Sequence, residues 1–229
     1  MNRLLVVCLI VATVSAAAQA QGQTPPLRKG VSVQMPVTRS ASPVPQADYF
    51  DAWIVTVAAD GRLYFGADPM TPDELAEWMK THPRNREATL YIKADARAPF
   101  ASVEKVLEIG RVMEFDMPVL LTAQVEHNAP GTMVPPKGVD VSVGSSLPSG
   151  AIATVVQLLP SGQEPRLLIN NDQTSWSALE STLRRHFQKG DDKLVLLRAD
   201  VRLPFSDVVY AIDSCRAVGA KVYLAEPGL

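Results

Sequence analysis

The sequence predicts an α+β fold made of two tandem, small, mixed-sheet domains, each with two helices packed on one face of its sheet. Two observations predict this fold: an internal repeat, and the alternation of helices with strands inside each copy. The chain has 229 residues, enough for one large domain or two small ones. The repeat favours two small domains of roughly one hundred residues each.

The repeat is clearest in two blocks of eleven residues, 90–100 and 195–205, at a constant offset of 105. The five identical pairs are Ala94 and Ala199, Asp95 and Asp200, Arg97 and Arg202, Pro99 and Pro204, and Phe100 and Phe205. Two shorter correspondences precede the blocks: 30–33 with 138–141, and 71–75 with 175–179. The chain beyond its N-terminal segment is therefore predicted to be a tandem duplication.

Composition and the repeat together predict where the chain is divided into an N-terminal segment, linkers and two repeats. Residues 1–20 combine a basic start, a short apolar run and a small-residue exit, which is the pattern of a secretory signal peptide. The alternative is an inner-membrane anchor formed by residues 4–18, although this run is shorter than the roughly twenty residues of a spanning helix. The expected parts that follow are a linker at 21–29, repeat 1 at 30–126, a Pro-rich linker at 127–137 and repeat 2 at 138–229.

Local signals predict the elements of the first copy. Asp60-Gly61 between two apolar runs favours a hairpin. Thr71 can cap a helix that has Pro72 in its first turn. The proline-rich residues 36–48 are expected to be a linker. The elements predicted in chain order are strands 30–33, 53–57 and 62–65, a helix from 71, a strand at 89–94, a helix from 99 and a strand at 117–121.

The second copy is predicted to repeat this order of elements. Its expected elements are strands 155–159 and 166–169, a helix at 175–187, a strand at 194–197, a helix from 204 to about 218 and a strand at 221–225. Because helices alternate with strands, crossover connections should make part of each sheet parallel.

The composition excludes several classes of function. The 22 basic and 24 acidic side chains give a net charge of -2, without the positive excess that favours nucleic-acid binding. His82, His127 and His186 stand far apart without metal-ligand spacing, and two cysteines are too few for a Cys-rich zinc site. We therefore expect no metal and no cofactor, and we interpret Cys215 as a buried core residue.

Asp95 and Asp200 are the strongest catalytic candidates because both recur. However, an aspartate between a strand and a helix-starting proline commonly accepts backbone N–H bonds in the corner. Arg97 and Arg202 can complete such a network. The sequence shows no nucleophile elbow and no phosphate-binding glycine loop beside them. We therefore interpret both aspartates as structural and predict no catalytic residue.

The order and spacing of these segments resemble the periplasmic domain of the ExbD/TolR family of biopolymer transport proteins. The resemblance covers about residues 28–122 and again 137–226, and it is carried by segments 30–36, 59–65, 70–75, 93–100 and 198–205. Two features differ from the family pattern. Family members normally have one periplasmic domain and one membrane helix, whose aspartate takes part in using the proton gradient. Residues 4–18 contain no Asp, Glu, Lys, Arg or His.

The resemblance implies a non-enzymatic periplasmic protein-interaction module of a proton-motive-force-linked transport system, without the proton-responsive helix. The implied partners are TonB- or Tol-type motor or energy-transducer proteins of the cell envelope, and not nucleic acid. The alternative is a peptidoglycan-associated or cell-wall-associated binding protein of the TolR type. Because the family domain dimerises, the two linked repeats are expected to pack on each other as an internal pseudo-dimer.

Overall fold

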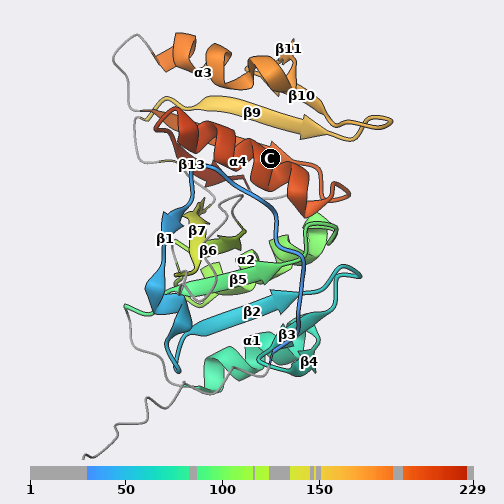
Figure 1. Cartoon of the computed structure of the whole chain (residues 1–229), viewed down its shortest axis with the longest axis vertical. Coiled ribbons are helices and arrows are strands. Elements are labelled where there is room, and N and C mark those ends of the chain that lie inside the picture. The colour runs from blue at the N-terminus through green and yellow to red at the C-terminus, as the bar shows by residue number, and fades with distance from the viewer. Residues whose placement is uncertain are drawn as a thin grey trace, which may run out of the picture.

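The computed structural model describes residues 30–82, 87–115, 117–123, 135–144, 147, 151–187 and 193–225. In this part of the chain, two mixed sheets of seven and six strands combine with four α-helices (Figure 1). The predicted α+β fold is confirmed. The predicted signal peptide and the linker at 21–29 lie outside the described residues, as does most of the linker at 127–137.

The first sheet has the strand order β1-β7-β6-β5-β2-β3-β4. Its strands are β1 (Ser42–Pro43), β2 (Trp53–Val57), β3 (Leu63–Phe65), β4 (Asp68–Met70), β5 (Leu90–Ala94), β6 (Val119–Thr122) and β7 (Lys137–Asp140). Strands β2, β5 and β6 are parallel, as the alternation of helices and strands predicted. Strands β2 and β3 form the predicted hairpin, and its turn residue Gly61 has a φ of 84°, a conformation that favours glycine.

Two helices cover one face of this sheet: α1 (Pro72–Thr81) and α2 (Phe100–Val112). Helix α1 begins with a capping box, in which Thr71 Oγ1 accepts the Glu74 N–H and the Glu74 carboxylate accepts the Thr71 N–H at 2.8 Å. Alternate strand residues such as Val55 and Ile92 belong to the core under the helices. Both helices lie on one face of the sheet, as predicted, because alternate residues of each strand point toward that face.

Residues 36–48 are not the linker that their composition predicted. They include β1 and the 3-10 helix η1 (Pro45–Asp48), and β1 pairs with β7. Val44 and Ala47 pack with Tyr91 and Leu121, on the side of the first sheet opposite to the helices. Proline here sets an extended backbone and a 3-10 turn that bury apolar side chains, so the segment is part of the domain. Residues 30–33, predicted as a strand, have no β-ladder.

The second sheet has the order β11-β10-β9-β12-β13-β8. Its strands are β8 (Ser142–Val143), β9 (Thr154–Leu159), β10 (Arg166–Ile169), β11 (Asp172–Thr174), β12 (Leu194–Ala199) and β13 (Lys221–Leu224). Its helical elements are the 3-10 helix η2 (Trp176–Ala178), α3 (Leu179–Phe187) and α4 (Phe205–Ala217). The second copy therefore repeats the predicted order, with β4 and β11 as unpredicted additions to the two copies.

Strand β7 belongs by sequence to the start of the second copy, but it joins the sheet of the first. It pairs antiparallel with β6, with Gly138 opposite Leu121 and Asp140 opposite Val119. The chain then returns to its own sheet through β8, which runs parallel to β13. The two copies are thus joined by an exchanged strand as well as by a covalent link.

The burial of Cys215 in the core can be tested by its reactivity. It is fully buried in α4, and this burial raises the pKa of its thiol to about 12. Because the thiolate is the reactive form, we expect a thiol reagent to label Cys215 at least about a hundredfold more slowly at neutral pH than after unfolding in urea. The experiment uses a Cys8→Ser chain, which leaves Cys215 as its single cysteine. Equal labelling rates in the folded and unfolded chain would contradict this burial.

Candidate functional site

Each copy turns from its central strand into its second helix through a corner with an aspartate, an arginine, a proline and a phenylalanine. In the first copy, Asp95 follows β5 and is 3% exposed. Its Oδ1 accepts the Arg97 N–H at 3.0 Å and the Arg97 Nε–H at 2.9 Å. Its Oδ2 accepts the Gln34 N–H at 3.0 Å. One carboxylate therefore holds both the corner and the N-terminal segment of the first copy.

The corner of the second copy repeats only the local part of this network. Asp200 Oδ1 accepts the Arg202 N–H at 3.0 Å, and Asp200 Oδ2 accepts the Arg202 guanidinium at 2.9 Å. The Asp200 side chain is 21% exposed, compared with 4% for Asp95. The prediction that both aspartates accept backbone N–H bonds, with the arginines completing the network, is confirmed. The second corner has the more open carboxylate.

The arginines hold the pKa of both carboxyl groups low. The Arg97 side chain is the largest cause for Asp95, whose pKa lies well below its usual range in spite of burial. The Arg202 side chain is the largest cause for Asp200, and it lowers the pKa to about 2. Both folded pKa values lie below those of the unfolded chain. The two carboxylates therefore make their full contribution to the free energy of unfolding above about pH 4. This contribution is lost as the pH falls below that value.

An Asp95→Asn chain is expected to lose about 2 kcal/mol of unfolding free energy at pH 7, because it replaces charge-assisted hydrogen bonds with neutral ones. The deficit should narrow below about pH 4, where acid already removes this contribution from the wild-type chain. The more exposed Asp200→Asn change should cost less. Urea unfolding at pH 7 and at pH 2.5 measures both variants. A deficit for Asp95→Asn that is independent of pH would contradict the assigned ion pair.

The two corners lie against each other, with Pro99 and Pro204 forming an antiparallel bridge. Four backbone hydrogen bonds join them at 2.8–2.9 Å, running from Phe100 N to Leu203 O, Phe205 N to Ala98 O, Ala101 N to Val201 O, and Ser206 N to Ala96 O. Each bond is matched by its counterpart at the offset of 105, so the contact has a local twofold arrangement. The first N–H groups of a helix lack intrahelical acceptors, and here the other copy supplies acceptors.

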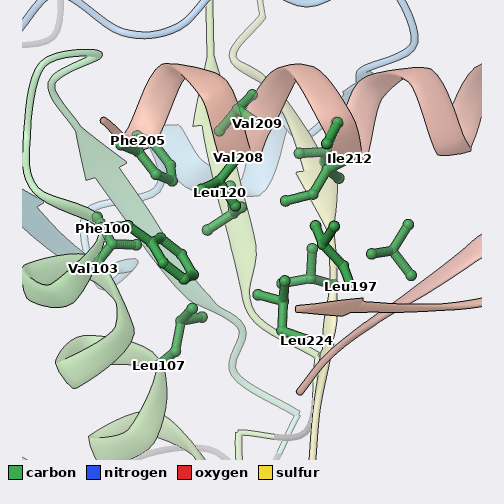
Figure 2. Close-up of a cluster of buried hydrophobic side chains, with 14 of the residues drawn as sticks. Phe100, Val103, Leu107, Leu120, Leu197, Phe205, Val208, Val209, Ile212 and Leu224 are labelled. Carbon is green, nitrogen blue, oxygen red and sulfur yellow. The ribbon is translucent and has the colours of Figure 1, made fainter. Parts of the chain in front are cut away.

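The apolar side chains behind these corners form one core that both copies share. Figure 2 shows Phe100 and Leu107 of α2 on one side and Phe205 and Ile212 of α4 on the other, around strand residues of both sheets. All of them belong to a single buried cluster that extends through both copies. The two repeats therefore pack on each other, as expected of an internal pseudo-dimer.

The N-terminal segment also reaches the second copy. Asp213 of α4 is 2% exposed and accepts the Arg39 N–H at 3.0 Å and the Ser40 N–H at 2.7 Å. The Arg39 guanidinium lies 2.7 Å from the carboxylate of Glu180 in α3. Sequence reasoning missed Asp213. The available signal was its position between Ile212 and Cys215, on the apolar face of a predicted helix.

A cavity of about 150 Å³ lies between α2 and the end of β13. Its wall combines apolar side chains such as Phe100 and Leu224 with the carboxylates of Glu104 and Glu108. Burial, with a smaller effect of the Glu108 charge, raises the pKa of Glu104. The residues that line this cavity include no histidine, serine, threonine or cysteine, so they offer no nucleophile–base pair of the usual kind.

The two histidines in the described ranges lie in different copies. His82 follows α1 and stacks on Trp78 with ring centroids 3.9 Å apart, whereas His186 lies in α3. His127 lies outside the described residues. In the described ranges, no three or more His, Cys, Asp or Glu side chains gather in a way that could hold a metal ion. The helices of the same ranges are too short or too polar to cross a membrane.

The fold and the paired corners define a class of protein: a duplicated α+β domain whose two copies pair with each other inside one chain. A family model described as "Biopolymer transport protein ExbD/TolR" matches the sequence twice, over residues 1–124 and 111–227. The chain therefore belongs to the ExbD/TolR family, whose members are non-enzymatic, envelope-associated components of biopolymer transport and work with energy-transducing partners. No curated protein and no solved structure matches the chain.

Proposed function

We propose that this chain is a non-enzymatic protein-interaction module of a proton-motive-force-linked biopolymer transport system, acting in the periplasm. The observation that carries the proposal is the pairing of two family domains within one chain, through four backbone hydrogen bonds and a common core. A linker keeps the two domains at a high effective concentration, so the pair needs no second chain. The protein would thus present a pre-formed paired domain to its partners.

The N-terminal sequence supports a passive role in such a system. Residues 4–18 contain no Asp, Glu, Lys, Arg or His with which to respond to a proton gradient. The proton-motive force would then act on a partner protein. This chain would bind that partner protein or the product of the partner's action. TonB- or Tol-type motor and energy-transducer proteins are the proposed partners.

Affinity purification of the tagged full chain from crosslinked cell envelopes tests the proposal. We expect motor or energy-transducer subunits to be enriched over a purification from cells that express the tag alone. A parallel experiment sediments the purified chain with peptidoglycan sacculi. Co-sedimentation with sacculi, without enrichment of any motor subunit, would overturn the proposal in favour of a cell-wall-binding protein of the TolR type.

The proposed location has a separate test. If residues 1–20 are a cleaved signal peptide, the mature chain begins at Gln21 and is released with the periplasmic fraction. N-terminal sequencing of the chain from each cell fraction measures this. A chain that retains Met1 and stays with the inner membrane would instead support an anchor at residues 4–18.

A further inference from the structure

In the first copy, the backbone of residues 31–34 lies along the end of β5. Lys93 Nζ donates to the Val31 carbonyl at 3.1 Å. The Gln34 N–H donates to Asp95 Oδ2 at 3.0 Å, and the Gln34 carbonyl accepts the Ala96 N–H at 2.7 Å. Three groups of the first copy thus hold one extended segment by its backbone.

The corresponding groups of the second copy, at the offset of 105, are Arg198, Asp200 and Val201. Arg198 Nε is buried and has no hydrogen-bond partner in the described part of the chain. Among the described residues, Asp200 Oδ2 accepts a hydrogen bond only from the Arg202 guanidinium, and the Val201 N–H has no acceptor. A buried polar group without a partner is costly, so Arg198 Nε points to a missing acceptor. Beside it, the partly exposed Asp200 carboxylate and the Val201 N–H can bind a backbone donor and a backbone acceptor of the same ligand.

The cause of this difference is the exchanged strand. The segment of the second copy that corresponds to residues 31–34 is β7, and β7 is paired with β6 of the first sheet. No described residue of the second copy makes the corresponding contacts with Arg198 Nε, Asp200 Oδ2 and the Val201 N–H. In another copy of this chain, both corresponding segments are engaged in the same way. Neither of these two segments is therefore free to fill the place in a neighbouring chain.

The row of polar groups continues into an apolar surface. Val155, Leu159, Leu168 and Leu196 alternate with the core residues of β9, β10 and β12, so they lie on the opposite face of the second sheet, and each is only half-buried. On the first sheet, the same face is covered by side chains of the N-terminal segment, including Met35 and Val44. The second copy thus has both the backbone-binding groups and an apolar surface beside them.

We propose that Arg198, Asp200, Val201 and the adjoining outer face of the second sheet bind an extended segment of a partner protein. This inference rests on the proposed interaction function and specifies how the partner is recognised. The segment places one carbonyl at Arg198, one N–H at Asp200 and one carbonyl at the Val201 N–H. It also turns an apolar side chain toward the sheet, as residues 31–36 do on the first copy.

A peptide with the chain's own sequence GVSVQMPV, residues 30–37, is the probe for this surface. We expect the acetylated, fluorescently labelled peptide to bind the purified full chain saturably at one site, as measured by fluorescence anisotropy. Asp200→Asn and Arg198→Met should each weaken binding by about fivefold or more, because each removes a hydrogen bond to or from a charged group. A peptide with proline in place of Gln34 lacks the N–H for Asp200 and should bind with a similar loss.

Asp172→Asn, on β11, is the matched control and should leave the affinity unchanged. Urea unfolding of each variant checks that the chain is folded, and two independent substitutions keep the test valid if one of them destabilises the protein. Absence of saturable binding, or equal affinity in the wild-type, Asp200→Asn and Arg198→Met chains, would overturn the proposal. Peptide binding tests this surface alone, whereas envelope purification tests the class of partner, so failure of one is distinguishable from failure of the other.

Discussion

Replacing Phe205 with alanine is expected to lower the free energy of unfolding by about 3–5 kcal/mol, the usual cost of removing a buried aromatic side chain. Phe205 has no exposed surface, and it starts α4 at the point where the two copies meet. Its side chain lies among core residues of both copies (Figure 2). The cavity left behind would therefore weaken the contact between the copies as well as the second copy itself.

Urea denaturation of the purified variant measures this loss as a shift in the unfolding midpoint. Phe50→Ala is the matched control, because Phe50 is 98% exposed and its removal should change stability by less than about 0.5 kcal/mol. Equal effects of the two substitutions would contradict the common core. A wild-type unfolding curve with two separate transitions would contradict it as well, since a single core predicts one cooperative transition.

Gly138→Ala is expected to destabilise the chain by about 1–3 kcal/mol and to displace β7 from the first sheet. A Cβ atom at Gly138 would lie 2.5 Å from Val119 Cγ1 and 2.9 Å from the carbonyl oxygen of Leu120. The second contact is with backbone inside the pairing of β6 with β7, so rotation of a side chain cannot relieve it. Glycine is therefore required at this position by close strand approach.

Gly162→Ala is the control for this substitution, because a Cβ atom at Gly162 has no neighbour within 4 Å. Urea unfolding measures the stability of both variants. Hydrogen exchange of the Leu120 and Thr122 amides, which point toward β7 in the register of β6 with β7, reports whether β7 has left its position beside β6. If Gly138→Ala were as stable as wild type and kept both amides protected, the placement of the exchanged strand would be wrong.

Much of each domain could be predicted because its signals are local. The Asp60-Gly61 turn, the cap at Thr71 and the apolar pattern of β5 depend on residues close together in the chain. The hydrogen bonds of Asp95 and Asp200 within their corners followed from the same kind of signal. Strands β4 and β11 were missed because each has three residues that are exposed or half-exposed, so neither has an apolar period.

Packing of the two copies on each other was expected from the family resemblance, but the particular contacts could not be predicted, because a repeat gives equivalent segments the same local signals. Residues 30–33 and 138–141 correspond in sequence, yet only the second of these segments contributes a strand to a sheet. The choice depends on which edge is free in three dimensions, which no local pattern records. For the same reason, the unpartnered Arg198 Nε is evident only when its surroundings are compared with those of Lys93.

Pairing of the two corners within one chain is tested most directly by hydrogen exchange at four amides. These are Phe100, Ala101, Phe205 and Ser206, at the starts of α2 and α4. In a chain that sediments as a monomer, we predict that all four are strongly protected, because carbonyls of the other copy accept their hydrogen bonds. The amide of Asp73, in the first turn of α1, is the reference without an acceptor among the described residues. Exchange of the four amides as fast as Asp73, or sedimentation as a dimer with the repeats apart, would contradict this pairing.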